Sequence, residues 1–353
     1  MENKLIQELG IKYPILQAPM AGVTTPELVS SVSNNNCLGS IGAGYLTADK
    51  TREFIHNVKK LTKHPFGINL FVPENHKLIE DKILKTNSLL DQYRKELQIV
   101  KDDLSISTKS EFEEQIEIVL KEKLKVCSFT FGIPSKEIVK ELKKKGTVVI
   151  GTATNVKEAQ IVESIGMDAV VVQGSEAGGH RGSFMNPDSL IGLMSLIPQV
   201  VDNVSIPVIA AGGIMDGRGV TAALCLGAKA VQLGTAFLTT KESGAHPLHK
   251  KAILNASEED VLLTRVFSGK TARGVNNKFM ENMREYENEL PAYPYQNTLT
   301  KEIRRVASEQ NNKEYMSLWS GQSPRLSREV SVKELIQSLQ EETKGILNQF
   351  VNL

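Results

Sequence analysis

Short apolar runs alternate with segments of helical spacing along most of the chain. The runs are rich in β-branched residues and are apolar at consecutive positions, which is typical of parallel strands covered on both faces. They lie at residues 15–18, 38–42, 66–71, 126–130, 147–152, 168–173, 206–211 and 230–235. Strands separated by helices must pair in parallel, and eight of them predict an α/β fold, a closed (β/α)8 TIM barrel rather than an open sheet.

Two longer segments of helical pattern interrupt this alternation. Residues 73–123 are charged and predict one or two surface helices inserted in the barrel. Residues 239–318 are also mostly helical and charged, without alternating strands, and predict a helical substrate or cap domain. A last helix is expected at about 331–348. We therefore expect the barrel to comprise residues 1–238 and 319–353, and the cap to comprise residues 239–318.

The composition is that of an ordinary globular protein, with 353 residues, 41% hydrophobic and 24% charged. This length suits one barrel of about 250 residues with additions. A formal net charge of +1 offers no field to attract nucleic acid or an anionic membrane, so neither partner is expected. No apolar run approaches the ~18 residues that span a bilayer, and the N-terminus lacks the apolar core of a signal peptide, so we expect a cytoplasmic location.

The three cysteines indicate neither a disulfide framework nor a zinc site. Cys37, Cys127 and Cys225 are odd in number, far apart in sequence and without C-x-x-C spacing. Cys127 and Cys225 lie within apolar sequence and are expected to be small core residues. No metal is therefore expected.

Glycine-rich loops follow several predicted strands, at the edge where this fold carries its chemistry. The most informative is V-V-V-Q-G-S-E-A-G-G-H-R-G at residues 170–182, in which a buried strand ends in four glycines and His180. Glycine accepts positive φ and has no Cβ to obstruct a flat ligand, and histidine is the side chain best able to move a proton near neutral pH. On its own, the loop also suits a glycine-rich turn with a solvated histidine and arginine.

The last two strand ends suit a phosphate. A glycine pair at 212–213 follows the seventh strand, and Gly234 and Thr235 follow the eighth. These loops form the usual phosphate site of the fold, whereas neither a P-loop nor a G-x-G-x-x-G follows a strand. With the amides of Asn69 and Gln173 at the barrel mouth, the pattern suits FMN. Each amide taken alone is also explained by capping of a strand end.

Six segments, taken together and in order, resemble the nitronate monooxygenase family, formerly called 2-nitropropane dioxygenases. They are Q-A-P-M-A-G-V at 17–23, G-S-I-G-A-G-Y at 39–45, P-F-G-I-N-L-F at 65–71, Q-G-S-E-A-G-G-H-R-G at 173–182, A-A-G-G-I-M-D-G at 210–217 and Q-L-G-T at 232–235. The segment at 173–182 is the most diagnostic, and the combination spans the whole barrel.

The resemblance implies an FMN-binding barrel that oxidises alkyl nitronates of the propionate 3-nitronate type with O₂, yielding a carbonyl compound and nitrite, as a detoxification. It makes His180 the catalytic residue, able to accept the α-proton of a nitroalkane when neutral and to stabilise a nitronate when protonated. The FMN-binding residues it implies are Met20, Asn69, Gln173, Gly178, Gly212, Gly213, Gly217, Gln232, Leu233, Gly234 and Thr235. Among these, Gly212, Gly213, Gly234 and Thr235 would hold the phosphate.

Two alternatives stay open at this stage. Flavin-dependent enoyl-acyl-carrier-protein reductase also carries G-G-H after its sixth strand, but uses NADH; the arginine after His180, the A-P-M-A-G opening and the long C-terminal region favour the monooxygenase. The other alternative is a flavin-binding protein without turnover. Tyr293, Tyr295 and Trp319 suit either substrate contacts or packing between cap and barrel. Either a monomer or a homodimer is expected.

Overall fold

The computed structural model describes residues 3–74, 78–100, 110–186 and 189–350. Residues 75–77 and 101–109 of the expected insert lie outside this description. So do residues 1–2, 187–188 and 351–353 of the expected barrel.

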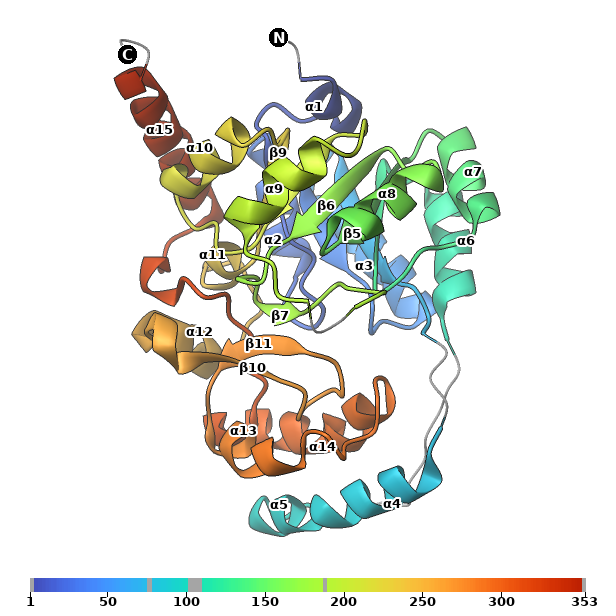
Figure 1. The fold of residues 1–353 in the computed structure, drawn as a ribbon, viewed down its shortest axis with the longest axis vertical. Helices are drawn as coiled ribbons and strands as arrows, with labels where there is room; N and C mark the ends of the chain where they lie inside the picture. The colour runs from blue at the N-terminus through green and yellow to red at the C-terminus, as the bar shows by residue number, and fades with distance from the viewer. Residues whose placement is uncertain (1–2, 75–77, 101–109, 187–188, 351–353) are drawn as a thin grey trace.

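Eight parallel strands form a barrel in the upper half of Figure 1. They are β1 (Ile15–Gln17), β2 (Gly39–Gly42), β3 (Phe66–Phe71), β4 (Val126–Thr130), β5 (Val148–Ala153), β6 (Ala169–Gln173), β8 (Val208–Ala211) and β9 (Ala230–Leu233). Their order is β1-β9-β8-β6-β5-β4-β3-β2, and Leu38, just before β2, closes the ring by accepting from Gln17 N (2.9 Å) and donating to Ile15 O (3.1 Å). The sequence-based expectation of a (β/α)8 barrel is confirmed.

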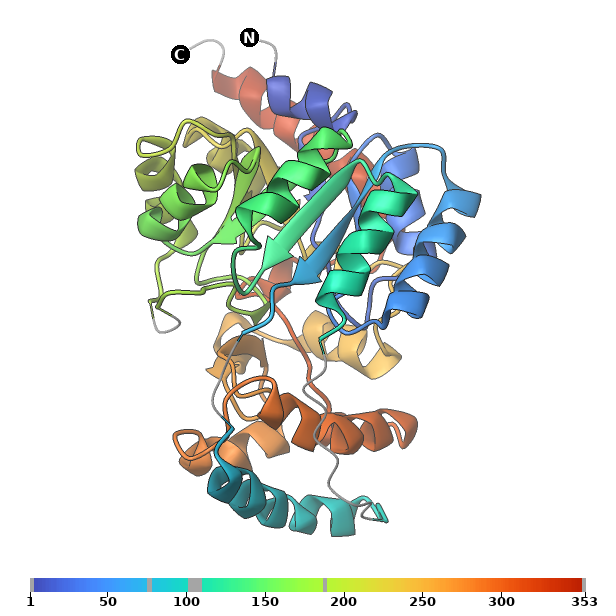
Figure 2. The ribbon, with the colours of Figure 1, turned by 90° about the vertical axis from the view of Figure 1, so that its right-hand side faces the viewer.

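Helices surround the barrel, as Figure 2 shows from the side of α6 and α7. They are α2 (Pro26–Asn34), α3 (Ala48–Leu61), α6 (Phe112–Glu122), α7 (Lys136–Lys144), α8 (Val156–Ser164), α9 (Leu193–Val201), α10 (Gly217–Cys225), α11 (Thr235–Leu238) and α15 (Val332–Phe350). Side chains of Thr25, Ser135 and Asn155 accept the N–H three residues on, which fixes where α2, α7 and α8 begin. Helix α9 begins at Leu193 because residue 192 has an extended backbone.

Both faces of the strands are buried, which explains their continuous apolar runs. Val170 and Val172 pack outward against the helices, while Val171 packs inward with Ile150 and Ile209. The short helix α1 (Lys4–Leu9) adds its buried leucine and isoleucine side chains to the inner cluster. Apolar packing therefore fills the inside of the barrel, and the carboxyl ends of the strands remain free to carry a site.

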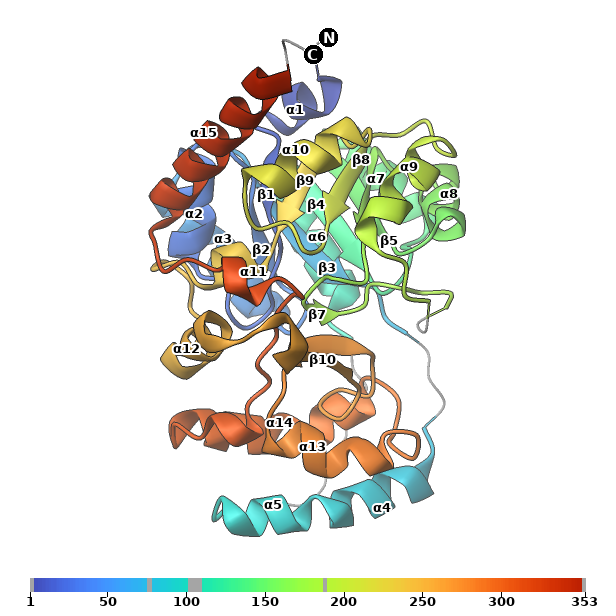
Figure 3. The same cartoon turned by 60° about the vertical axis from the view of Figure 1, so that its left-hand side comes forward.

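The second unit lies beneath these carboxyl ends in Figures 1 and 3. Its helices are α12 (Pro247–Asn255), α13 (Lys278–Met283) and α14 (Tyr295–Glu309), with short 3-10 turns at Glu258–Asp260, Arg284–Tyr286, Lys313–Tyr315 and Pro324–Leu326. Its strands β10 (Val261–Thr264) and β11 (Ala272–Val275) were not predicted from the sequence. These pair antiparallel with each other, and β11 also pairs with β7 (Gly179–His180) from the loop after β6. The segment is therefore not wholly helical.

The expected insert divides between the two units. Helices α4 (Glu80–Leu89) and α5 (Asp91–Glu96) lie along the cap in Figure 3 rather than on the barrel. The Tyr93 ring lies 4.9 Å from that of Phe279 and 5.8 Å from that of Tyr315, measured between centroids, inside the apolar core of the cap. Helix α6 instead contributes to the outer barrel core. One charged segment therefore supplies both a barrel helix and a layer of the cap.

The cysteines and the surface complete the description. Cys37 and Cys127 are buried, and burial raises the pKa of both thiols, that of Cys37 to about 12. The expectation of a core position for Cys225 is wrong, because this last residue of α10 is exposed.

Within the described ranges, no helix is long and apolar enough to cross a membrane, and no group of His, Cys, Asp and Glu has metal-binding geometry.

Candidate active site

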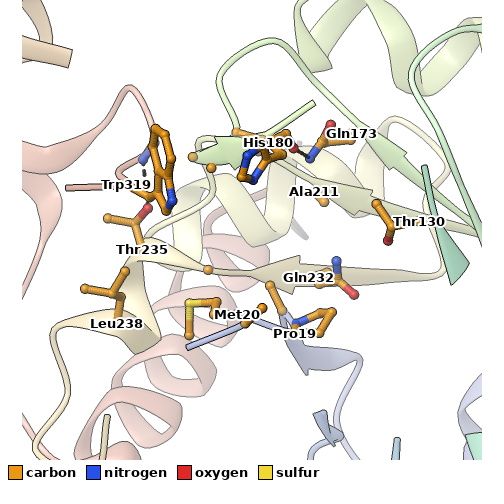
Figure 4. A pocket seen from close by; sticks show the side chains of 18 of the residues that line it. Pro19, Met20, Thr130, Gln173, His180, Ala211, Gln232, Thr235, Leu238 and Trp319 are labelled. Carbon is orange, nitrogen blue, oxygen red and sulfur yellow. Dashed lines mark hydrogen bonds between the residues drawn. The ribbon is translucent and has the colours of Figure 1, made fainter. Parts of the chain in front are cut away.

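A cavity opens at the carboxyl ends of the barrel strands, on the side that faces the cap. Ten of the predicted site residues line it: Met20, Asn69, Gln173, Gly178, His180, Gly212, Gly213, Gln232, Gly234 and Thr235. Other lining residues were not predicted, among them Thr130, Thr152, Leu238, His249 and Ser323. The strand ends thus bring together segments more than 200 positions apart, as Figure 4 shows.

Two predicted cofactor residues do not line the cavity. The Leu233 side chain is 1% exposed and packs in the outer barrel core. Gly217 begins α10, and its N–H donates to the Glu342 carboxylate of α15 at 2.8 Å. A Cβ at position 217 would lie 2.4 Å from Glu342 Cβ, so this glycine is explained by the close approach of α15.

Backbone groups form one corner of the cavity. Gly212 and Gly213 have φ of 123° and 67°, which favour glycine, and these values turn the chain after β8. Within the part of the chain that the structure describes, the N–H groups of Gly213, Gly234 and Thr235 meet no protein acceptor. The Thr235 hydroxyl accepts from Gly321 N at 2.9 Å. This hydrogen bond brings residues 319–323, the return segment that leads from the cap back to the barrel, to the same corner. Unpaired amides around a hollow suit an anionic ligand.

Amide and hydroxyl side chains line the opposite side. Asn69 donates from Nδ2 to the hydroxyls of Ser128 and Thr130, both at 3.0 Å, which fixes the orientation of its amide. Its Oδ1 therefore remains as an acceptor for a ligand donor. Figure 4 shows Gln232 pointing into the same space, and its amide has no protein partner among the described residues.

The Gln173 side chain holds the loop that carries His180. Its Nε2 donates to His180 O (3.0 Å), and its Oε1 accepts from Gly182 N (2.8 Å), which ties both ends of the loop to strand β6. Arg181 points away from the cavity and is 1% exposed. Its guanidinium donates to the carbonyls of Gln173 (3.1 Å), Gly174 (2.7 Å) and Ser189 (3.1 Å). The side chains of Gln173 and Arg181 therefore stabilise the conformation of the loop that carries His180.

Three further contacts fix this loop and could not be found from the sequence. Glu158 is fully buried and accepts from Ser183 Oγ at 2.8 Å and from the backbone beyond it. Arg273 of β11 donates to Ser175 O at 3.1 Å. A Cβ at Gly178 would lie 2.5 Å from Gly321 N, so the loop can pass under the return segment only with glycine there.

His180 lies at the edge of the cavity in strand β7, opposite Ala272 of β11. Its Nε2 is 2.8 Å from the hydroxyl oxygen of Ser268. Burial, together with the positive charges of Arg304 and Lys270, lowers the pKa of His180 to about 3. The imidazole is therefore neutral at pH 7, with a lone pair on one nitrogen.

Aromatic rings surround this histidine. Its ring centroid lies 5.3 Å from that of Trp319, 5.8 Å from Phe131 and 6.3 Å from Tyr293. Tyr295, in contrast, is buried in the apolar core of the cap. Of the three aromatic residues in the C-terminal region considered in the sequence analysis, two therefore contact the histidine and one packs within the cap.

Phe131 adopts an unusual backbone conformation beside His180. Its φ is 72°, a value that bulky residues rarely adopt and that persists only where the surrounding structure holds it in place. Lys270 Nζ lies 4.7 Å from the centre of the Phe131 ring and 2.7 Å from Glu74 Oε1. A buried cation from the cap thus lies close to the histidine side of the cavity.

A second histidine, the buried His249 of α12, also lines the cavity. Its Nε2 is 2.9 Å from Trp319 O, and because a carbonyl only accepts, this nitrogen carries the proton. Burial lowers the pKa of His249 to about 4. Trp319 is further fixed by a β-bridge to Gly274 of β11. His249 therefore helps to hold the indole beside His180.

The family model and the curated relatives agree on one family. The family model described as nitronate monooxygenase matches residues 2–342. A probable nitronate monooxygenase of Staphylococcus haemolyticus is 52% identical over 349 residues, covering 98% of each chain. A probable nitronate monooxygenase of Staphylococcus aureus is 51% identical over 329 residues, covering 92% of this chain and 93% of the relative.

Two solved structures share the fold over the full length. Nitroalkane oxidase from Streptomyces ansochromogenes superposes with a TM-score of 0.92 at 37% identity, covering 98% of this chain and 99% of the other. FabK from Thermotoga maritima superposes with a TM-score of 0.81 at 31% identity, covering 100% and 99%.

The environment of His249 predicts how stability depends on pH. Its pKa falls from an ordinary 6.5 to about 4 on folding, so its contribution is intact above pH 6.5 and is lost as the pH falls towards 4. At pH 5.5 we expect a loss on the order of 1 kcal/mol relative to pH 7.5. In urea unfolding, the free energy of unfolding should fall by about 1 kcal/mol less in His249→Gln than in the parent between pH 7.5 and pH 5.5, because glutamine does not titrate. The exposed His64→Gln is the control, and equal losses in parent and His249→Gln would contradict the assignment.

Proposed function

Because the chain belongs to the nitronate monooxygenase family, a family of flavin-dependent oxidoreductases, we propose that it oxidises alkyl nitronates with O₂ and bound FMN. The products are a carbonyl compound and nitrite, and propionate 3-nitronate represents the substrate class, with detoxification as the role. The observation that carries the proposal is a half-buried, neutral His180 at the edge of a cavity that has a corner of unpaired backbone N–H groups. We further propose that the enzyme acts in the cytoplasm as a monomer or homodimer, without nucleic acid or membrane.

The residues of the cavity fit FMN. The unpaired N–H groups of Gly213, Gly234 and Thr235 suit its phosphate. Asn69 Oδ1 and the Gln232 amide provide an acceptor and donors for the edge of a flat heterocycle. When bound, the flavin supplies the transfer of electrons from the substrate to O₂.

His180 supplies the proton chemistry. At physiological pH it is neutral and has a lone pair that can accept the α-proton of a nitroalkane. Its lowered pKa makes it a weak base, and the negative charge that develops on the substrate as the proton leaves raises its affinity for that proton. The electron pair of the broken C–H bond then stays on the substrate as the nitronate. A histidine that has gained this proton stabilises the anion beside it. For a substrate that arrives already as a nitronate, no proton needs to be removed.

The charges around His180 favour an anionic substrate. Lys270 and Arg304 both act on the imidazole electrostatically and disfavour its protonated form. Because Lys270 is paired with Glu74, the charge of Arg304 is the main attraction for an anion that enters the cavity on this side. A nitronate carries such a charge, whereas the enoyl thioester of the alternative reductase is neutral at its reacting atoms. The structural likeness to FabK keeps that NADH-dependent reaction as the second candidate.

Replacing His180 tests the catalytic role. His180→Asn should lower nitrite release from a nitroalkane by about 10²- to 10⁴-fold, because an amide cannot accept the proton. The bound flavin, measured by its visible absorbance, should be retained. The exposed His64→Asn is the matched control and should keep both properties. Unchanged turnover in His180→Asn would exclude this role, and a flavin-loaded parent that releases no nitrite would favour the non-catalytic flavin-binding protein.

Replacing Gly213 tests the phosphate corner. Gly213→Ala strains a backbone with φ of 67° and places a Cβ 3.2 Å from Glu176 Cβ, which should turn the amide away from the phosphate. A weakened charge-assisted hydrogen bond should raise the Kd for FMN about tenfold or more, measured by quenching of flavin fluorescence. Gly146→Ala is the control, because Gly146 also has positive φ (78°) with open space at its Cβ. An equal Kd in both variants would contradict this phosphate site.

A further inference from the structure

Ser268 makes an unusual set of contacts behind His180. It lies between β10 and β11, is 1% exposed and does not line the cavity. Its hydroxyl oxygen is 2.8 Å from His180 Nε2, 3.1 Å from Lys270 O and 3.3 Å from Lys270 N. The hydroxyl therefore joins the histidine ring to a turn of the cap backbone.

Counting hydrogens decides which group donates. The hydroxyl has one hydrogen and can accept from two donors, whereas the Lys270 carbonyl can only accept. If Ser268 donates to that carbonyl, it accepts from both Lys270 N–H and His180 Nε2–H, and all three contacts become hydrogen bonds. If Ser268 instead donates to the histidine, the Lys270 carbonyl loses this donor. Since an unpaired buried carbonyl costs free energy, the first arrangement is favoured.

We propose that Ser268 is a positioning residue that keeps the proton of neutral His180 on Nε2 and leaves Nδ1 as the proton-accepting atom. The tautomer follows from the contacts of Ser268 alone, whereas its consequence for turnover rests on the proposed function.

The contacts of His180 leave its second ring nitrogen, Nδ1, on the side of the cavity. Nε2 is engaged by Ser268, which lies outside the lining, while Nδ1 has no partner among the described residues. The ring cannot swing away easily, because its backbone pairs with Ala272 and its carbonyl accepts from Gln173. A substrate proton would therefore move from the α-carbon to Nδ1, with the bonding electrons left on the nitronate. The Nε2–H remains bonded to Ser268 throughout, and this bond strengthens as the ring becomes positive.

Nitrogen NMR of the histidine rings tests the tautomer directly. In flavin-loaded protein with ¹⁵N-labelled histidine, His180→Asn assigns the resonances of His180, and His249 is an internal reference because Nε2–H faces the Trp319 carbonyl. At pH 7 we expect His180 as the Nε2–H tautomer in the parent. Ser268→Ala should shift the population towards Nδ1–H. A parent in the Nδ1–H form, or a tautomer that Ser268→Ala leaves unchanged, would overturn the proposal.

Kinetics separate positioning from a general structural effect. A nitroalkane needs removal of its α-proton, whereas a preformed nitronate does not. Ser268→Ala should therefore lower kcat for the nitroalkane about tenfold or more beyond any effect on the nitronate. Ser268→Thr, which keeps the hydroxyl, should restore the parent's ratio of kcat for the nitroalkane to kcat for the nitronate. Ser33→Ala, a fully buried serine of α2, is the matched control.

The kinetic outcomes are distinct from failure of the proposed function. An equal loss on both substrates in Ser268→Ala would overturn the positioning role. If the parent oxidised neither substrate, the proposed function would fall, while the NMR result would still decide the tautomer.

Discussion

The pairing of β7 with β11 is the contact on which the site depends. Two residues of a barrel loop join an antiparallel sheet of the cap, and the second of them is His180. On the barrel side, Arg181 donates to three backbone carbonyls, and on the cap side Arg181 N–H donates to Thr271 O at 2.8 Å. The glycines before His180 allow this path, because the chain passes directly beneath Gly321. The loop is therefore fixed between barrel and cap, and the histidine with it.

Burial and positive charge set the chemistry of the cavity together. Burial and the charges of Arg304 and Lys270 keep His180 neutral, and under the proposed function Arg304 would attract the nitronate, because Lys270 is paired with Glu74. Lys270 comes from the turn that also holds Ser268, and its partner Glu74 comes from the segment that leads into α4. The cap thus supplies charge, the orientation of the histidine and part of the aromatic surroundings. The barrel supplies the backbone corner and the amides that suit FMN.

The sequence predicts the barrel well, and the cap less well, for physical reasons. Parallel strands buried on both faces leave continuous apolar runs, and glycines mark their ends, so all eight strands could be found, together with the cavity residues that lie at glycine-rich strand ends. Strands β10 and β11 are short and pair partly with a segment far away in sequence, which leaves no local pattern. Ser268 lies 88 positions from its histidine, and a lone serine carries no signal. Gly217 was predicted to bind FMN, but it does not line the cavity, and the close approach of Glu342 explains the glycine at this position.

The most direct test of nitronate oxidation is the visible absorbance of the flavin-loaded protein without oxygen, mixed separately with propionate 3-nitronate and with NADH. Cations beside a neutral histidine, together with membership of the nitronate monooxygenase family, lead us to expect rapid bleaching by the nitronate and little change with NADH. Admission of air should then restore the colour and release nitrite. Rapid bleaching by NADH with no response to the nitronate would contradict this function and favour the enoyl reductase.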